Sequence, residues 1–271
     1  MPLMAVRAVE AGIRKLYHYE AFHPKHLEDT LVSQHIHVSN PQHFNDPWDC
    51  YPCLDTKRVT DPAYRASCIE VFRRSPSLGL TAAQQRHYER KLQADSHFFT
   101  EMLRTDFREG IRNMVVERWR IYCLTRHGDR PLMWSHYSNK HQGICLEFDA
   151  GQPVIGNAIQ VEYKDALPVL DILTFVPKDA FQILVTKSPD WSYEDEYRIL
   201  AHDAGSDDVP PQLPITTKDF LPLPPRALTG IIAGCRADVD TIKVLVEKYA
   251  PGLPVKRAVQ APDRYCLSIQ E

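Results

Sequence analysis

The sequence predicts an α+β fold, in which a mixed or split β-sheet core carries an inserted helical lobe. Strand-like segments dominate both ends of the chain, whereas helical patterns cluster between them over residues 62–118. No glycine-rich phosphate loop, as found in nucleotide-binding doubly wound folds, is present. With 271 residues, 44% of them hydrophobic, the chain can bury a sizeable core. We therefore expect one domain over residues 1–271, with residues 62–118 as an insertion within it.

The first elements are predicted from alternation and turn residues. Residues 14–19 alternate like a strand, residues 24–34 form a helical pattern with a proline near its start, and residues 35–39 again suit a strand. Residues 40–49 combine two prolines with asparagine and aspartate, which favour turns. The chain should thus begin as strand, helix and strand, and then enter an irregular loop that exposes polar groups.

Helical patterns then continue to residue 118. Thr81 can cap a helix that contains residues 84–92, and a longer helix should cover residues 96–118. The chain afterwards returns to strands, and one amphipathic helix precedes the last of them. We expect strands at residues 120–125, 143–148, 159–163, 193–200, 230–233 and 265–269, and the helix at residues 238–249.

The most site-like segment is the expected strand at residues 193–200. Alternate side chains of a strand share a face, so Glu194, Glu196 and Arg198 would lie in line, about 7 Å apart. Tyr197 would point the other way, into a packed surface. The two carboxylates disfavour each other's ionisation while the guanidinium favours it, and such opposed effects set the pKa of a carboxylate in many sites. The alternative is an exposed edge strand that carries mixed charge.

A second group of chemically capable side chains lies in residues 133–143, which include Trp134, Ser135, His136 and Tyr137. At least one of Ser135, His136 and Tyr137 is a candidate for a functional role. The alternative is structural, since Trp134 and Tyr137 would share one helix face in an ordinary core, and His136 would satisfy a buried carbonyl. The sequence leaves both interpretations open.

A metal site is a further hypothesis, because Asp46 and Asp49 could supply oxygen ligands together with His136 and Glu196. This set lacks any recognised spacing of metal ligands. The Cys-x-x-Cys pair at residues 50–53 has no second pair at zinc spacing. No metal is therefore predicted, although a metal-dependent hydrolase or nuclease remains an alternative.

The charge and the cysteines of the chain limit which classes of partner and which cellular compartment we expect. The net charge is -3, yet residues 58–126 carry 13 Lys or Arg against 8 Asp or Glu. This basic lobe could bind phosphate groups. The alternative is that its charged residues lie on solvated helix faces. Seven scattered cysteines suit reduced thiols. The chain has no apolar run of about 18 residues and no signal-like N-terminus. We expect a cytoplasmic protein with no membrane partner.

Four motifs occur in an order that resembles a known family. They are residues 16–19 (Leu-Tyr-His-Tyr), residues 38–49, residues 133–137 with Gly143, and residues 187–198. Together they resemble a large bacterial family catalogued as domain-of-unknown-function family 2971. The resemblance spans nearly the whole chain, since the segment from residue 231 also resembles the closing section of that family. It implies no settled activity.

A more distant resemblance is to the split-sheet ADP-ribosyltransferases, whose motifs are a histidine, then an aromatic residue or serine, then a glutamate. This resemblance implies that His18 holds the ribose of NAD and that Ser39 or Tyr137 takes the middle position. It implies further that Glu196 is the catalytic carboxylate and that Glu194 is the upstream member of a Glu-x-Glu pair.

The transferase resemblance also implies NAD as co-substrate. Breaking the bond between nicotinamide and ribose develops oxocarbenium character, which the carboxylate of Glu196 would stabilise. Tyr19 or Tyr137 could stack on nicotinamide, and Arg198 or Lys187 could pair with a pyrophosphate oxygen. The motif around residue 46 has no counterpart in the transferase pattern. The candidate nucleotide-binding residues are Tyr19, Ser39, Asn45, Asp46, Trp134, Ser135, His136, Lys187 and Arg198.

Three classes of function follow. The first is NAD-consuming glycosyl transfer, as in an ADP-ribosyltransferase or NAD glycohydrolase, in a bacterial toxin or phage-defence effector whose acceptor is a protein or a nucleic acid. The second is the metal-dependent hydrolase or nuclease. The third is a module that binds a nucleotide or a partner without turnover, with residues 62–118 carrying the interface.

Overall fold

The computed structural model describes residues 6–74, 81–174, 177–203 and 213–271. The chain forms two compact units. The sheet unit comprises Met1–His43, Arg118–Tyr163 and Pro189–Glu271, and the helical unit comprises Phe44–Glu117 and Lys164–Ser188. Each unit is thus assembled from segments that are distant in sequence.

The sheet unit is built on a mixed sheet that has nine strands in the described residues. The strand order is β11-β10-β4-β1-β5-β13-β14-β15, and β6 pairs with β10. The pairs β10 with β11 and β13 with β14 are parallel, whereas the other pairs are antiparallel. The strands are β1 (Lys15–Glu20), β4 (Trp119–Thr125), β5 (Ile144–Asp149), β6 (Ile159–Gln160), β10 (Glu196–Asp203), β11 (Ile215–Thr216), β13 (Leu228–Ala233), β14 (Val255–Gln260) and β15 (Leu267–Gln270).

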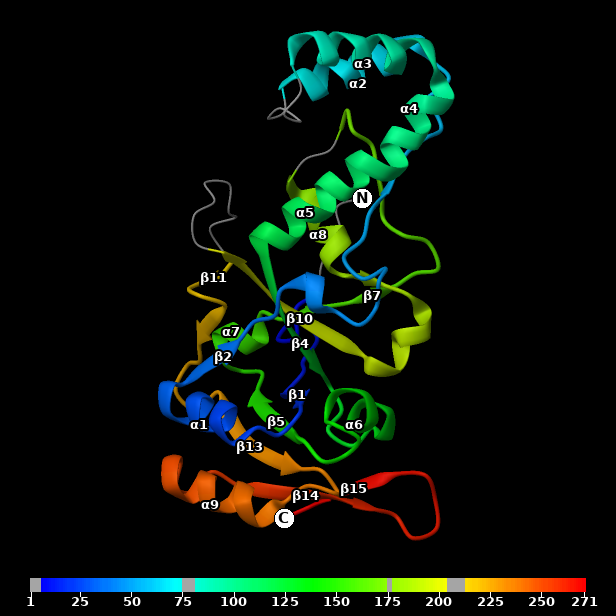
Figure 1. The fold of residues 1–271 in the computed structure, drawn as a ribbon. Coiled ribbons are helices and arrows are strands. Elements are labelled where there is room, and N and C mark those ends of the chain that lie inside the picture. The colour runs from blue at the N-terminus through cyan, green and yellow to red at the C-terminus, as the bar shows by residue number, and fades with distance from the viewer. Residues whose placement is uncertain (1–5, 75–80, 175–176, 204–212) are drawn as a thin grey trace. The chain divides into compact units, whose positions relative to one another are not determined.

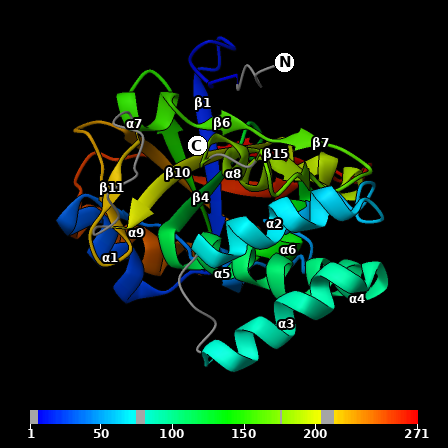
Figure 2. The same cartoon turned by 90° about the horizontal axis from the view of Figure 1, so that it is seen from above.

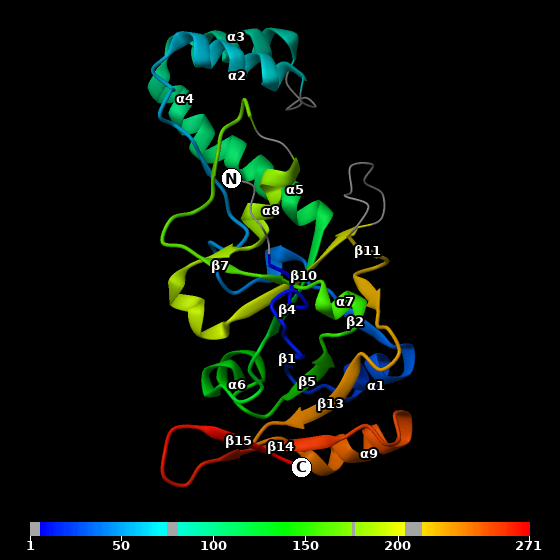
Figure 3. The same ribbon diagram turned by 180° about the vertical axis from the view of Figure 1, so that it is seen from behind.

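Short elements and helices surround this sheet. The small strands β2 (His35–His37) and β12 (Phe220–Pro222) pair with each other, and β7 (Glu162–Tyr163) follows β6. Figure 1 shows α1 on one side of the central strands β1 and β5 and α6 on the other, and Figure 3 shows the same arrangement from behind. The helices are α1 (Pro24–Ser33), α6 (Pro131–Tyr137), α7 (Pro153–Gly156) and α9 (Val239–Tyr249), with the 3₁₀ helices η1 (Pro41–His43) and η3 (Pro189–Glu194).

The two faces of the sheet bury different side chains because successive residues of a strand point to opposite faces. On the α1/α9 face, Leu16 and Phe148 pack in the large core that also contains Leu27 of α1 and Ile242 of α9. On the α6 face, a smaller cluster surrounds the fully buried Trp134 of α6. The members of the smaller cluster are Tyr19, Met133, Trp134, Cys145, Ile232, Ala258 and Leu267.

The helical unit contains the segment in which helices were expected. Thr81 caps α3 with a capping box, in which its hydroxyl accepts from the backbone of Gln84 while the side chain of Gln84 accepts from the backbone of Thr81. Figures 1 and 2 show α2 and α3 side by side. The elements of the helical unit are β3 (Cys53–Leu54), α2 (Pro62–Arg74), α3 (Ala82–Ala94), α4 (Ser96–Met102), the π-helix η2 (Leu103–Phe107), α5 (Arg108–Arg118), β8 (Val169–Leu170), α8 (Pro177–Leu184) and β9 (Thr186–Lys187).

The predicted α+β class with a mixed sheet is confirmed. Most elements lie within two or three residues of their expected bounds, and the continuous helical run at residues 96–118 is interrupted only by its π-helical turn. Strand β14 was not expected, because residues 255–260 mix charged and apolar side chains. Nowhere in the described ranges does a helix combine the length and the apolar character needed to cross a bilayer.

Gly143 ends the turn between α6 and β5, at a position where the packing leaves no room for a side chain. A Cβ at this position would lie 2.1 Å from the backbone oxygen of Glu20, whereas a Cβ at Gly230 of β13 would meet its nearest atom at 3.5 Å. Gly143→Ala should therefore lower the free energy of unfolding by about 3 kcal/mol or more, whereas Gly230→Ala should change it by less than about 1 kcal/mol. Urea unfolding of both variants checks this, and equal effects would contradict it.

Candidate functional site

The two glutamates of the expected Glu-x-Glu strand lie on different elements. Glu194 is the last residue of η3, and β10 begins only at Glu196. Between them Asp195 has a φ of 46°. Aspartate tolerates this left-handed conformation better than most residues, and its carboxylate is held by Arg126 and by His127. The expected strand at residues 193–200 is therefore wrong for its first three residues.

Glu196 and Arg198 do share a face of β10 and form a buried ion pair. The guanidinium donates from Nε to Oε1 at 2.8 Å and from its terminal nitrogen to Oε2 at 3.1 Å, which is a bidentate arrangement. Glu196 is 3% exposed and Arg198 is 0% exposed. Strand β10 lies between β4 and β6 in the sheet. The alternative of an exposed edge strand with solvated charges is therefore excluded.

Glu194 binds a residue of the second predicted motif. The hydroxyl of Tyr137, at the end of α6, donates a hydrogen bond of 2.5 Å to Oε1 of Glu194. Glu194 is 2% exposed, whereas Tyr137 is half-buried. The structure thus brings together two candidate residues that are 57 positions apart in the sequence.

Four rings form an aromatic cluster around this hydrogen bond. His136 lies 6.2 Å from Tyr137, 6.5 Å from Trp191 and 6.3 Å from Tyr193, measured between ring centroids. The rings of Trp191 and Tyr193 are 6.1 Å apart. His136 is exposed and the other three rings are half-buried, so the aromatic cluster offers ring surface to a ligand beside the carboxylate of Glu194.

Two other residues of the predicted motifs belong to the core. Trp134 is completely buried, donates from its indole nitrogen to the carbonyl of Gly128 at 3.0 Å, and packs edge-on against Tyr19 at 5.0 Å. The hydroxyl of Tyr19 donates to the carbonyl of His127 at 2.8 Å. The structural interpretation of Trp134 therefore holds, while Ser135 next to it is exposed.

His18 and Glu196 lie on opposite faces of the sheet, contrary to the expectation that they face each other. Tyr17 and Glu196 are both in register with Thr125 of β4, so these three side chains share the α6 face. His18 alternates to the α1/α9 face, where its ring stacks on Tyr122 at 4.1 Å. A ribose held by His18 would thus lie across the sheet from Glu196.

Burial displaces the pKa values of His18 and its neighbour Glu20 in opposite directions. Burial lowers the pKa of His18 to about 4, although a hydrogen bond to the carbonyl of Cys123 partly opposes this. Burial raises the pKa of Glu20 to about 7. Nε2 of His18 is 4.0 Å from Oε2 of Glu20. Each group thus favours its neutral form in the folded protein.

Ser39 lies beside β4. Its backbone exchanges two hydrogen bonds of 2.8 Å with Ile121, which anchors the chain after β2 to the sheet. This contact defines a structural role for the backbone of Ser39.

The remaining candidates belong to the helical unit. Asp46 is buried and its carboxylate accepts from the backbone of Trp48 at 2.9 Å, whereas Asn45 is exposed. Nζ of Lys187 lies 3.7 Å from Oδ2 of Asp49, and both side chains are buried. This unit therefore has its own buried ion pair.

The metal hypothesis finds no ligand set among the described residues. Within these ranges no group of three or more His, Cys, Asp or Glu side chains could hold a metal ion. Asp46 and Asp49 belong to the helical unit, whereas His136 and Glu196 belong to the sheet unit. Neither cysteine of the Cys-x-x-Cys pair forms a disulfide within the described residues.

One buried charge cluster was not expected. Glu147 on β5 is 3% exposed and accepts from Lys15 at 2.7 Å, from Lys256 at 3.1 Å and from Thr229 at 3.1 Å. Burial alone would raise the pKa of Glu147, but the two ammonium groups hold it below its usual value. Burial and this carboxylate raise the pKa of Tyr17 to about 12. The one signal in the sequence was a glutamate within an otherwise apolar strand.

The comparisons with known proteins bear on the segment that contains this site. Residues 133–199 match the model of a family described as "Protein of unknown function (DUF2971)". This segment is therefore similar to the domain-of-unknown-function family that the motifs predicted. Neither the curated proteins nor the solved structures contain a match to the chain. The more distant similarity to ADP-ribosyltransferases gains no support from these comparisons.

Because Arg198 is buried and Arg126 is partly exposed, substitution of these two arginines should change the free energy of unfolding by very different amounts. Arg198→Met leaves the carboxylate of Glu196 buried without its bidentate partner, so it should lower the free energy of unfolding by about 3–5 kcal/mol. Arg126→Met breaks the pair with Asp195, in which the arginine is 44% exposed, and should cost less than about 1 kcal/mol. Denaturant unfolding measures both. Similar small losses would show that the Glu196–Arg198 pair does not stabilise the fold.

The pH dependence of stability should reveal the opposed shifts of His18 and Glu20. As the pH falls from 6.5 towards 4, the unfolded state binds a proton at His18 before the folded state does, so this group lowers stability. As the pH falls from 7 to 4.5, the folded state binds a proton first at Glu20, so that group raises stability. The two effects offset each other in the wild type.

Substitution should separate these effects. Relative to the wild type, Glu20→Gln should lose stability as the pH falls from 6.5 to 5, by up to about 1.4 kcal/mol per pH unit. His18→Gln should gain stability over the same range. Urea unfolding at several pH values gives both slopes, and parallel pH profiles for the three proteins would refute the assignment.

Proposed function

We propose that the protein cleaves the bond between nicotinamide and ribose in NAD, with Glu194 as the carboxylate that acts on the ribose. The observation that carries this proposal is the carboxylate of Glu194 bound by Tyr137 within the aromatic cluster. A ring system that can stack on a heterocyclic base, next to a carboxylate that can face its sugar, is the combination that cleavage of an N-glycoside needs.

The chemistry follows from charge. When the bond between C1′ and the nicotinamide nitrogen breaks, its electron pair leaves with nicotinamide and positive charge develops on the ribose. The carboxylate of Glu194, which is 2% exposed and therefore shielded from bulk water, stabilises this charge. Water or an acceptor hydroxyl then attacks C1′ and loses its proton to solvent. Transfer to a protein or nucleic acid would be ADP-ribosylation, and transfer to water would be NAD hydrolysis.

The proposed roles differ from those that the transferase resemblance implied. Glu196 is bound in bidentate fashion by Arg198, so its charge is compensated and its position is fixed. We therefore assign the reacting carboxylate to Glu194 and give Glu196 and Arg198 the role of positioning the start of β10. We still propose that the sheet resembles the split sheet of the transferases. His18 no longer contacts the ribose in this proposal.

The biological setting is proposed from the same activity. Cysteines that form no disulfide within the described residues suit a reducing compartment, and we propose the cytoplasm. An enzyme that consumes NAD there would deplete a central cofactor, which fits a toxin or a phage-defence effector.

Nicotinamide release from NAD by the purified full chain tests the proposal. Glu194→Gln keeps the shape and a hydrogen-bond acceptor for Tyr137 but removes the charge, so it should lower the rate about 100-fold or more. Tyr137→Phe should lower it about tenfold, because the carboxylate loses one oriented donor. Chromatographic detection of nicotinamide measures these rates.

A matched control is Asp190→Asn, which removes an exposed carboxylate from the same 3₁₀ helix and should leave the rate unchanged. Thermal unfolding of each variant shows whether it is folded. Equal loss of activity in Asp190→Asn and Glu194→Gln would contradict the assignment. Absence of nicotinamide release from the wild type, with or without candidate acceptors, would reject the enzymatic proposal.

A second candidate is a nucleotide-binding module without turnover. The near-complete burial of Glu194 and Glu196 favours it, because a carboxylate that reacts must meet its substrate. In that case NAD would raise the melting temperature of the wild type without release of nicotinamide. Glu194→Gln would then retain the thermal shift.

A further inference from the structure

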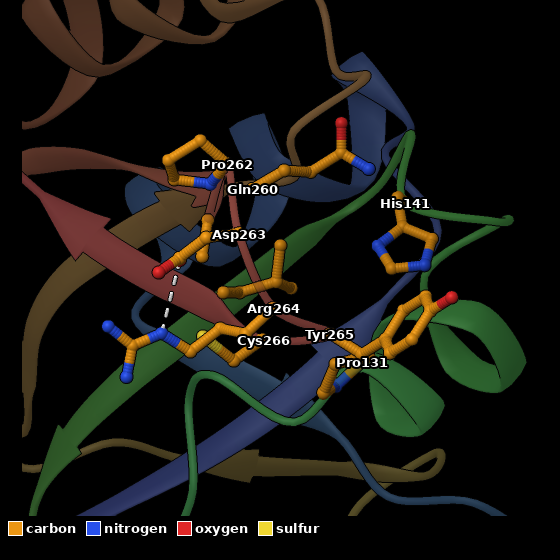
Figure 4. A pocket seen from close by; sticks show the side chains of 10 residues that line it. Pro131, His141, Gln260, Pro262, Asp263, Arg264, Tyr265 and Cys266 are labelled. Carbon is orange, nitrogen blue, oxygen red and sulfur yellow. Dashed lines mark hydrogen bonds and ion pairs between the residues drawn. The ribbon is translucent and has the colours of Figure 1, made fainter.

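A cavity of about 800 Å³ opens in the sheet unit, apart from the aromatic cluster. The loop between β14 and β15 forms one wall, and Pro131 and His141 form the other (Figure 4). This volume lies in the range that small-molecule sites occupy. The cavity shares no residue with the site proposed around Glu194. Its lining residues are Pro131, His141, Gln260, Ala261, Pro262, Asp263, Arg264, Tyr265, Cys266 and Leu267.

One ring nitrogen of His141 lacks a hydrogen bond to the described residues. Its Nδ1 is buried and has no hydrogen-bond partner within the described part of the chain. Buried ring nitrogens are normally paired, so one without a partner needs an explanation such as a ligand. Burial and the nearby charge of Arg236 lower the pKa of His141. The ring is therefore neutral at pH 7, with one nitrogen that donates and one that accepts.

The backbone holds His141 in place independently of its side chain. Asn139, Lys140 and His141 have φ values of 45°, 56° and 71°, three consecutive left-handed residues. The amide of His141 donates to the carbonyl of Trp134 at 3.1 Å, and its carbonyl accepts from Arg236 at 3.0 Å. Non-glycine residues adopt this conformation at a cost in free energy, which is typical of sites where a side chain must be presented in one direction.

The facing loop supplies an aromatic ring and an arginine side chain. Tyr265 is fully exposed and points towards the same space as His141 in Figure 4. Arg264 is exposed, and its pair with Asp263, 3.3 Å from Nε to Oδ1, lies at the surface, where it is screened by water. The cavity thus combines an exposed ring, a neutral imidazole and one guanidinium, that of Arg264. Arg236 lies near His141 outside the lining.

We propose that this cavity binds a nucleotide. The base packs against Tyr265 and hydrogen-bonds to the half-buried imidazole of His141, while the phosphate lies near Arg264. A base offers both a ring face and polar edges, and the phosphate complements the guanidinium of Arg264, so one ligand class satisfies all three features. The site is independent of the proposed NAD chemistry because the two share no residue.

Titration calorimetry of the full chain tests the proposal, with AMP, GMP, CMP and UMP as probes and inorganic phosphate as the comparison. At least one nucleotide should bind more tightly than phosphate. Tyr265→Ala should weaken its binding about tenfold, the scale of base stacking on an aromatic side chain. His141→Gly should weaken it by a similar factor while the melting temperature changes by less than about 4 °C, because glycine accepts the left-handed backbone.

Asn139→Gly is the matched control, since it changes a left-handed residue of the same turn outside the cavity wall and should bind as the wild type does. Glu194→Gln should also bind the nucleotide normally, which separates this site from the NAD proposal. Absence of nucleotide binding, binding no tighter than that of phosphate, or unchanged affinity in Tyr265→Ala and His141→Gly would overturn the inference.

Discussion

The bidentate ion pair between Glu196 and Arg198 is the interaction on which the arrangement of the site depends. A carboxylate and a guanidinium that are almost completely buried are tolerated only when their hydrogen bonds are made, and here two bonds of 2.8 Å and 3.1 Å link them along one strand. The pair occupies the beginning of β10, directly after the left-handed turn at Asp195. The pair therefore stabilises the start of the strand that directly follows the contact between Glu194 and Tyr137.

The sheet separates two kinds of environment. The α1/α9 face buries an extensive apolar core, and the ionisable pair of His18 and Glu20 lies there with both pKa values displaced towards the neutral forms. The α6 face instead carries the compensated charges of Glu196 and of Glu147. Strand alternation alone produces this division, because neighbouring residues of β1 point to opposite faces.

Local patterns in the sequence predicted most of the fold. The strand at residues 14–19, the helical run at residues 96–118 and the capping by Thr81 all follow from periodicity and cap chemistry that act over a few residues. The face occupied by His18 could not be predicted, because it depends on the register of β1 with β4. The turn at Asp195 was not predicted. Polar and apolar side chains alternate regularly over residues 193–199, although the backbone at Asp195 adopts a left-handed conformation.

The order of strands has a consequence for the family segment at residues 133–199. This segment includes most of α6, all of β5 and η3, and the start of β10, and therefore both partners of the Tyr137–Glu194 hydrogen bond. Yet β5 and β10 are not neighbours, since β1 and β4 separate them in the sheet and come from outside the segment. The matched region therefore contains only part of the sheet in which its own strands lie. The most recognisable part of this chain owes its geometry to two strands that the family model does not cover.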